Sequence, residues 1–483
     1  MLKQTKIVAT ISDKRCEVDF ITDLFNAGMN VVRMNSAHLG KDGFDAIIKN
    51  TRAVSNRIGI LMDTKGPEVR TTISEAPIPL KTGDTVLIKG DIEGITTRDC
   101  IYVNYKNFAN DIKLGGVILI DDGDLELKVI EKNPDFLTLE VLNDAVLGSR
   151  KSVNVPGVRI NLPSLTEKDR TNILYAIENR IDFIAHSFVR SKQDVLDIQR
   201  ILDEHRSPIK IIAKIENQEG VDNIDEILEA AYGIMVARGD LGIEVPQEKI
   251  PGLQRIMIRK CIAAKKPVIV ATQMLHSMIN NPRPTRAEVT DVANAIYSRT
   301  DALMLSGETA YGKFPVEAVR TMSSIAREAE INKLSENDVR VPTPNDDLDV
   351  TSFLSKQAVK TSQKLHVKAI VTDSHTGRTA RNLAAFRGKS PVFAICYREG
   401  TARELALSYG VWAEYQAETN NDPKKYFLDA LDKLIKKQMI SRNDMVAYLS
   451  GSFGEGGGTS FLEINNVGKI LDGTNPFKPP FFK

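Results

Sequence analysis

Residues 210–240 begin with the apolar run Lys210-Ile-Ile-Ala-Lys-Ile-Glu216 and end with a second one, Gly233-Ile-Met-Val-Ala-Arg-Gly-Asp240. A continuous apolar run that closes on charged residues is typical of a strand in a parallel sheet, because such a strand is covered on both faces. The residues between the two runs, 221–231, have the pattern of a helix. The stretch therefore predicts a strand, a helix and a second strand parallel to the first.

The same pattern occurs along much of the chain. Eight runs have it, at 6–10, 30–35, 59–63, 182–187, 210–216, 233–240, 267–273 and 301–308. Helices are expected in most of the gaps, at 18–27, 166–179, 191–204, 221–231, 252–264, 286–297 and 315–329. Eight strand-then-helix units are the number that closes a TIM barrel. The fold class is therefore predicted to be α/β, with a (β/α)8 TIM barrel over residues 1–67 and 162–340.

Residues 68–161 interrupt the barrel pattern after its third strand. Short strands are expected there at 85–88, 101–103, 117–120, 125–130 and 136–141, separated by turn-forming residues such as Asn133-Pro-Asp135. Close spacing of short strands and turns is typical of a small β domain. We expect an inserted β-barrel domain that covers the barrel mouth as a lid.

The last third of the chain is expected to form another unit. The segment Val341-Pro-Thr-Pro-Asn-Asp-Asp347 is polar and proline-rich, which is typical of a linker. Beyond it, predicted helices at 352–365, 379–386, 401–409 and 424–437 alternate with predicted strands at 369–372, 392–396 and 445–449. This alternation predicts a C-terminal open α/β domain over residues 346–483.

The overall composition excludes several classes of protein. Of the 483 residues, 42% are hydrophobic and 26% are charged, a balance typical of soluble globular proteins. A formal net charge of +1 provides no broad positive field, so we expect neither nucleic acid nor a membrane as a partner. The four cysteines are far apart in the sequence, and no signal peptide precedes the first predicted strand. Both features fit a protein of the reducing cytoplasm.

Charged residues at the ends of the predicted barrel strands indicate a catalytic site, because barrel enzymes carry their catalytic residues there. Lys214 and Glu216 are two residues apart on one strand, so their side chains lie on the same side of it. Glu216 and Asp240 end successive strands, and two neighbouring carboxylates can share a hard cation such as Mg²⁺. Lys214 beside that cation would stabilise charge on a phosphoryl group. A salt bridge between Lys214 and Glu216 explains the same pattern without a metal.

Two other features of the strand ends also have two interpretations. Arg33 lies near the end of the second predicted strand, and its guanidinium can hold two phosphate oxygens or make a salt bridge at the barrel rim. Gly239 and Gly242 let backbone N–H groups approach a ligand closely, but a tight turn before a helix uses the same residues.

Seven barrel segments, in their order along the chain, resemble the pyruvate kinase family. They are Thr5-Lys-Ile-Val-Ala-Thr-Ile11, Gly28-Met-Asn-Val-Val-Arg-Met-Asn35, Met62-Asp-Thr-Lys-Gly-Pro-Glu-Val-Arg-Thr71, Lys214-Ile-Glu-Asn-Gln-Glu-Gly220, Met235-Val-Ala-Arg-Gly-Asp-Leu-Gly242, Ala271-Thr-Gln-Met-Leu275 and Met304-Leu-Ser-Gly-Glu-Thr-Ala310. Within the insert, Ile120-Asp-Asp-Gly123 and Val153-Asn-Val-Pro-Gly157 match the same family. The resemblance covers residues 5–330, and the C-terminal third resembles the family only in its layout.

The resemblance implies a reaction and its participants. A pyruvate kinase moves a phosphoryl group from phosphoenolpyruvate to ADP, giving pyruvate and ATP in the final step of glycolysis. It uses Mg²⁺ or Mn²⁺ together with K⁺, and the resemblance implies a cytoplasmic homotetramer.

The resemblance also implies roles for residues at the matching positions. Glu216 and Asp240 would bind the divalent metal, and Lys214 would stabilise the phosphoryl group and the enolate oxygen. Arg33 would clamp the phosphoryl group. The substrate carboxylate would be held by the backbone around Ala237, Arg238, Gly239 and Asp240, together with Thr272. Ser306 and Thr272 would deliver a proton to the enolate.

Other matching positions imply cation and nucleotide contacts. Asn35, Asp63 and Thr64 would bind K⁺, and His38, Arg70 and Lys151 would contact the nucleotide. Ala37 stands where the family has a serine that helps to hold K⁺, so weaker K⁺ binding is expected. Glu68 resembles the residue of the K⁺-requiring members, since a lysine there accompanies independence from K⁺.

The last domain of this family binds a sugar-phosphate effector. Ser374-His-Thr-Gly-Arg-Thr379 resembles the turn that holds it, which assigns Ser374, Thr376, Gly377, Arg378 and Thr379 to a phosphate nest. A second glycine-rich loop, residues 451–460, carries Glu455, whose carboxylate would repel a bisphosphate. A helix N-cap followed by an ordinary loop is the alternative explanation.

Two other functions compete with the kinase. A metal-dependent lyase or phosphotransferase that acts on phosphoenolpyruvate or pyruvate would not need nucleotide contacts from the insert, such as Arg70 and Lys151. A regulatory subunit without activity should have lost Lys214, Glu216 or Asp240, and all three are present.

Overall fold

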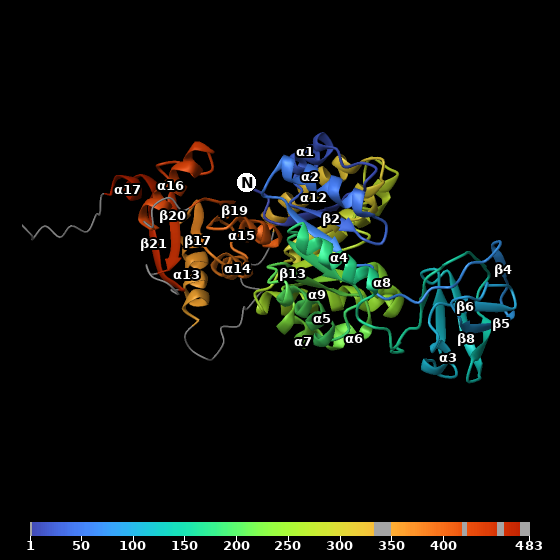
Figure 1. The fold of residues 1–483 in the computed structure, drawn as a ribbon. Helices are drawn as coiled ribbons and strands as arrows, with labels where there is room; N and C mark the ends of the chain where they lie inside the picture. Colours follow the sequence, from blue (N-terminus) through green and yellow to red (C-terminus); the bar gives the residue numbers. More distant parts are fainter. Residues whose placement is uncertain (1, 333–348, 418–422, 452–457, 474–483) are drawn as a thin grey trace, which may run out of the picture.

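The computed structural model describes residues 2–332, 349–417, 423–451 and 458–473. Its barrel lies in the middle, the inserted β unit extends from one end of the barrel, and the C-terminal unit lies at the other end (Figure 1). The predicted linker at 341–347 lies outside the described residues.

Eight parallel strands close the barrel in the order β1-β16-β15-β14-β13-β12-β3-β2. Their bounds are β1 (Lys6–Thr10), β2 (Val31–Asn35), β3 (Gly59–Asp63), β12 (Phe183–His186), β13 (Lys210–Ile215), β14 (Gly233–Ala237), β15 (Val268–Ala271) and β16 (Ala302–Leu305). The eight predicted strands and the predicted barrel are therefore confirmed. Nearly every residue of these strands is buried, which is why they occur as continuous apolar runs.

Helices form the outer layer of the barrel. They are α1 (Val18–Ala27), α2 (Lys41–Val54), α4 (Glu167–Glu178), α5 (Lys192–Glu204), α6 (Gln218–Asp222), α7 (Ile224–Ala230), α9 (Ile250–Ala263), α10 (Arg286–Tyr297) and α12 (Pro315–Ile331). The prediction of one helix at 221–231 is wrong, because this region forms two helices, α6 and α7, that are separated at Asn223. The side-chain amide of Asn223 donates to the Arg190 carbonyl (2.8 Å). In the described ranges, no helix is long and apolar enough to cross a membrane.

Two barrel strands end well before their predicted last residues, Asp240 and Glu308. Strand β14 ends at Ala237 and β16 at Leu305, and each is followed directly by a short helix, α8 (Arg238–Glu244) or α11 (Gly307–Ala310). Residues expected at strand ends, such as Asp240 and Glu308, therefore lie on first helical turns. The first N–H groups of a helix have no partner inside it, so these turns bring hydrogen-bond donors to the barrel mouth.

The insert has a hydrophobic core of its own, in which Ile88, Leu127 and Leu139 are buried. Its strands form one sheet in the order β11-β7-β8-β9-β5-β6 and a second in the order β10-β4. The elements are β4 (Ile78–Leu80), β5 (Thr85–Gly90), β6 (Cys100–Val103), α3 (Phe108–Asp111), β7 (Val117–Ile120), β8 (Leu125–Lys132), β9 (Phe136–Val141), β10 (Ala145–Leu147) and β11 (Val153–Asn154). The five predicted strands are present, whereas β4, β10 and β11 were too short for their pattern to be detected.

The C-terminal unit is an open α/β sheet, as predicted, with strand order β19-β18-β17-β20-β21. Its elements are α13 (Val350–Lys364), β17 (Ala369–Ser374), α14 (Arg378–Ala385), β18 (Val392–Cys396), α15 (Glu399–Glu404), β19 (Val411–Tyr415), α16 (Pro423–Lys436), β20 (Met445–Gly451), β21 (Thr459–Asn466) and α17 (Val467–Asp472). Strands β19 and β21 were not predicted. Both lie at sheet edges, and β21 pairs antiparallel with β20.

The C-terminal unit closes the barrel at the end opposite the mouth. Leu407, from the short 3-10 helix Leu405–Leu407 between α15 and β19, is fully buried in the cluster inside the barrel, together with Val8 and Leu61. Ion pairs surround this plug, between Arg387 and Asp301 (2.6 Å) and between Arg403 and Asp182 (2.6 Å). The barrel floor is therefore made in part by another domain.

Candidate active site

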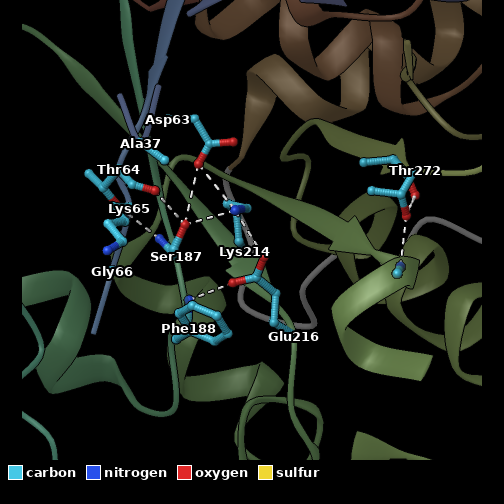
Figure 2. Close-up of polar contacts among 12 residues, drawn as sticks. Ala37, Asp63, Thr64, Lys65, Gly66, Ser187, Phe188, Lys214, Glu216 and Thr272 are labelled. Atoms are coloured by element: carbon cyan, nitrogen blue, oxygen red, sulfur yellow. Dashed lines mark hydrogen bonds and ion pairs between the residues drawn. The ribbon is translucent and has the colours of Figure 1, made fainter. Parts of the chain in front are cut away.

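A buried group of polar side chains lies at the barrel mouth, where β3, β12 and β13 are neighbours. The ammonium of Lys214 lies 3.1 Å from Asp63 Oδ1 and 2.9 Å from Glu216 Oε1, and it donates to the hydroxyl of Ser187 (2.7 Å). Figure 2 shows these four side chains pointing toward one another. The salt bridge weighed for Lys214 and Glu216 is thus present, but within a larger cluster.

Arg33 belongs to the same cluster. Its guanidinium contacts Asp63 Oδ2 through Nε (2.7 Å) and through Nη2 (2.6 Å), and Nη1 donates to the hydroxyl of Thr10 (3.0 Å). The rim salt bridge considered for Arg33 therefore exists, and it fixes the guanidinium next to Lys214. Two cations are held together at the mouth by one shared carboxylate.

The pKa values follow from burial and from these charges. Burial would raise the pKa of Asp63, but Lys214 and Arg33 outweigh it and hold that pKa below its ordinary value. Burial would lower the pKa of Lys214, but Asp63 and Glu216 raise it above its ordinary value, so Lys214 remains an ammonium. Burial raises the pKa of Glu216 to about 7, and repulsion from Asp240 adds to the shift. A cation beside Glu216 would reverse this shift.

The carboxylates at the mouth fit a divalent metal of the Mg²⁺ type. No group of three metal-binding side chains of the His, Cys, Asp or Glu type occurs in the part of the chain that the structure describes. Mg²⁺ needs only one or two carboxylates, because waters and substrate oxygens complete its shell. Glu216 and Asp240 line one cavity, and burial together with repulsion from Asp240 raises the pKa of Glu216, a shift that a bound cation would reverse.

The neighbouring strands β14 and β15 bring Thr272 and Gly239 together. The N–H of Gly239 donates to the hydroxyl of Thr272 (2.7 Å), which in turn donates to the carbonyl of Ala271 (2.6 Å; Figure 2). Thr272 has a φ of +68°, a strained conformation of the kind that is concentrated at functional sites. Sequence reasoning assigned both residues to substrate binding. In the structure, the two residues are hydrogen-bonded to each other.

The guanidinium of Arg238 is held by Asp291 and by the backbone of Thr272. Its Nη1 lies 2.8 Å from Asp291 Oδ2, and its Nη2 donates to the carbonyl of Thr272 (2.7 Å). The backbone of residues 237–240 is left to meet the substrate carboxylate, and the side chain of Asp240 lines the mouth cavity. Ser306 begins α11, and its N–H donates to the buried carboxylate of Glu308 (2.8 Å).

The oxygen atoms predicted to bind a monovalent cation lie next to the Lys214 cluster. The Thr64 carbonyl accepts a hydrogen bond from the Ser187 hydroxyl (2.7 Å), and Asp63 is shared with Arg33 and Lys214. Asn35 Oδ1 accepts the N–H of Ala37 (3.1 Å). Amide, carboxylate and carbonyl oxygens are ligands that suit K⁺. Ala37 contributes no such oxygen from its side chain.

The root of the insert and the barrel mouth enclose a cavity of about 570 Å³. Arg70 and Asp122 line it from the insert, opposite Glu216 and Asp240 of the barrel. Arg70 pairs with Glu68 (2.7 Å), and Lys151 pairs with Asp121 (2.6 Å). The two predicted nucleotide contacts of the insert thus lie on paired segments, since the N–H of Thr71 donates to the Lys151 carbonyl (2.8 Å).

His38, the third predicted nucleotide contact, is separate from the other two. It lies in the exposed loop after β2. No hydrogen bond or ion pair joins it to Arg70 or Lys151 within the described part of the chain.

The predicted phosphate nest is the turn that begins α14. Gly377 has a φ of +74°, and its N–H donates to the hydroxyl of Ser374 (2.8 Å). The hydroxyl of Thr379 hydrogen-bonds that of Thr459 (2.7 Å). The guanidinium of Arg378 reaches Asp349 (3.1 Å) instead of the turn, and Glu455 lies outside the described residues.

Ser187 is the residue of the cluster for which sequence reasoning gave no role. Its hydroxyl accepts from Lys214, and it connects Lys214 with the Thr64 carbonyl and Asp63. The position of Ser187 could have been predicted from the order of the strands, because β12 lies between β3 and β13 in the barrel. A hydroxyl at the end of β12 must therefore lie between Asp63 and Lys214.

Comparisons of the sequence and of the structure with known proteins all find similarity to the same family. The family described as "Pyruvate kinase, barrel domain" matches residues 2–319, and "Pyruvate kinase, alpha/beta domain" matches residues 353–465. A pyruvate kinase of Borreliella burgdorferi is 46% identical over 98% of this chain and 99% of that protein. One of Geobacillus stearothermophilus is 44% identical over 98% of this chain and 81% of that protein. The crystal structure of a pyruvate kinase from Cryptosporidium parvum has a TM-score of 0.90 at 36% identity and covers 96% of both chains.

Proposed function

The chain belongs to the pyruvate kinase family, and we propose that it transfers the phosphoryl group of phosphoenolpyruvate to ADP, giving pyruvate and ATP in the last step of glycolysis. The observation that carries this proposal is the pair of fixed cations, Arg33 and Lys214, beside the carboxylates Glu216 and Asp240 at the barrel mouth. The test is a coupled assay of pyruvate formation from phosphoenolpyruvate and ADP with Mg²⁺ and K⁺. Absence of pyruvate formation by folded protein would contradict the proposal.

The reaction needs neutralised charge more than covalent help. The bond between phosphorus and the enol oxygen of phosphoenolpyruvate breaks, and a terminal phosphate oxygen of ADP takes the phosphoryl group. Arg33 and Lys214 face the charge that develops on that group and on the enolate oxygen left behind. A divalent cation held by Glu216 and Asp240 would add charge neutralisation when bound.

The enolate then takes a proton at its methylene carbon and becomes pyruvate. Lys214 is unsuited to give that proton, because Asp63 and Glu216 raise its pKa above the ordinary value. We assign proton delivery to the hydroxyl groups of Thr272 and Ser306 and to the water they would order. The Gly239 N–H, which holds the Thr272 hydroxyl, keeps that group in place.

The remaining partners follow from the family resemblance. We propose that Arg70, Lys151 and His38 contact the nucleotide, and that the protein acts as a cytoplasmic homotetramer. All four cysteines are free thiols, which supports a reducing compartment.

Glu216→Gln and Asp240→Asn are each expected to raise the Mg²⁺ concentration that gives half-maximal activity. Each change removes one of the two carboxylates that are assigned to the metal. The measurement is turnover against free Mg²⁺ at constant ionic strength, with Glu178→Gln on the exposed face of α4 as the control. Half-saturation at the wild-type concentration in both variants would place the metal elsewhere.

Activity is expected to require a monovalent cation, and Ala37→Ser is expected to bind K⁺ more tightly than the wild type. The new hydroxyl would replace a ligand that Ala37 cannot supply, where a water has to substitute at modest cost. The measurement is KCl titration of both forms from buffer without sodium or potassium. Ala53→Ser, at an exposed position of α2, is the matched control. Full activity without K⁺ would refute the requirement, and an unchanged midpoint in Ala37→Ser would refute the role of position 37.

A further inference from the structure

Two connections join the insert to the barrel, an outgoing one after β3 and a returning one before α4. Residues 187–190, which follow β12, contact both connections. Two of these four residues, Ser187 and Phe188, also contact side chains assigned to the reaction. The segment 187–190 therefore links the root of the insert to the barrel mouth.

Arg190 holds the returning connection. Its Nη1 donates to the carbonyl of Ile160 (3.2 Å), and its Nη2 donates to that of Leu162 (3.1 Å). Asp194 of α5 holds the arginine in turn, because its Oδ1 lies 3.4 Å from Nη2 and its Oδ2 accepts the Arg190 N–H (2.8 Å). Only 16% of the Arg190 side chain is exposed, so these contacts are largely enclosed. A planar guanidinium with five donors suits such a bridge better than the single nitrogen of a lysine.

The outgoing connection packs against the same segment at Gly66. A Cβ atom at that position would lie 2.8 Å from Ser187 Cβ and 2.9 Å from Cδ2 of Phe188, so only glycine allows this approach. Phe188 itself has a φ of +56°, a conformation that is costly for a residue with a side chain and persists only where the surroundings enforce it. We attribute it to the close packing at Gly66 on one side and to the contacts of Arg190 on the other.

The backbone of Phe188 contacts one of the two carboxylates assigned to the metal. Its N–H donates to Glu216 Oε2 (2.7 Å), while the ammonium of Lys214 lies 2.9 Å from the other oxygen, Oε1 (Figure 2). Groups that hydrogen-bond a metal ligand fix its orientation and thereby affect its affinity for the metal. The orientation of Glu216 therefore depends on a backbone segment whose far end is fixed to the insert.

We propose that Arg190 is a positioning residue, which fixes the returning connection of the insert and, through Phe188, the orientation of Glu216. The proposal rests on the proposed function, because it takes Glu216 as a ligand of the divalent metal. It makes metal binding and the order of the returning connection depend on each other. By linkage, a metal that binds better when this connection is in place must hold the connection in place to the same extent.

The first test measures Mn²⁺ binding to the full-length protein, with K⁺ present and without substrates, from the electron paramagnetic resonance signal of free Mn²⁺. Arg190→Gln is expected to weaken binding by about 3- to 30-fold, the usual range for a residue that acts through its neighbours. Arg190→Lys keeps the charge beside Asp194 and should have a smaller effect. Arg200→Gln is the control, because it removes an exposed arginine that pairs with Asp197 of α5 (3.6 Å), and it should bind Mn²⁺ as the wild type does.

Hydrogen exchange on the wild type provides a second readout that does not depend on the folding of a variant. Mn²⁺ should slow exchange at the amides of Asn161 and Leu162, and Arg190→Gln should remove that protection. Unchanged Mn²⁺ affinity in Arg190→Gln, an equal loss in Arg200→Gln, or no protection of residues 161–162 by bound Mn²⁺ would overturn the proposal.

The same measurements separate this proposal from the proposed function. A wild type that binds no Mn²⁺ would overturn both the metal assignment and the role of Arg190. Pyruvate formation by the wild type, together with unchanged Mn²⁺ binding in Arg190→Gln, would overturn the role of Arg190 alone.

Discussion

Replacing Lys214 with methionine is expected to lower kcat by on the order of 10²–10³-fold, the usual effect of removing one preorganised charge-stabilising group. The reason is that the Lys214 ammonium is fixed by three oxygen partners, Asp63, Glu216 and Ser187, at the place assigned to the phosphoryl group. The same change leaves two buried carboxylates without their shared cation. Removal of one partner from a buried ion pair typically destabilises a protein by about 3–5 kcal/mol.

The effect on catalysis must be separated from this loss of stability. Urea unfolding measures the stability of Lys214→Met, and turnover is then measured well below its melting temperature. Lys41→Met, on the exposed surface of α2, makes the same chemical change away from the site and serves as the control. Lys214 would have no part in the mechanism if the folded variant turned over at the wild-type rate.

Deleting residues 70–159 and joining the ends with glycines is expected to leave a folded barrel whose ADP-dependent turnover falls by at least about 10²-fold. The insert keeps its own buried cluster, separate from the barrel core, so the barrel loses little packing. The deletion removes Arg70 and Lys151, and it opens the 570 Å³ cavity above Glu216 and Asp240 to solvent. Both losses affect positioning and water exclusion, on which transfer depends.

The control for the deletion is a variant in which only the turn between β8 and β9, residues 133–135, is replaced. That variant changes the insert but keeps its root. Circular dichroism and thermal unfolding show whether the shortened chain folds. Turnover at the full rate in a folded deletion variant would remove the insert from the catalytic cycle.

Much of the fold could be predicted because its signals are local. Each barrel strand is a buried apolar run, so its position is visible in the sequence without knowledge of its neighbours. The pairing of Lys214 with Glu216 was visible in the same way, since residues two apart on a strand share a side. The turns after β14 and β16 were not visible, because a helix that starts directly at a strand end adds no gap to the pattern.

Other features depend on neighbours that the local sequence does not identify. Ser187 gains its place from the order of strands around the barrel, and Asn223 breaks a helix through a contact with Arg190, far along the chain. The position of Arg378 is a similar case. The sequence around Arg378 suggested a phosphate-binding turn, yet its side chain pairs with Asp349. The position of Asp349 is set by the packing of α13 against α14.

Because Leu407 is buried inside the barrel, the barrel depends on the C-terminal unit more than on the insert. The insert joins the barrel only at its root and could in principle be exchanged for another module there. The C-terminal unit instead fills the floor of the barrel with Leu407, so its removal would expose a hydrophobic interior to water.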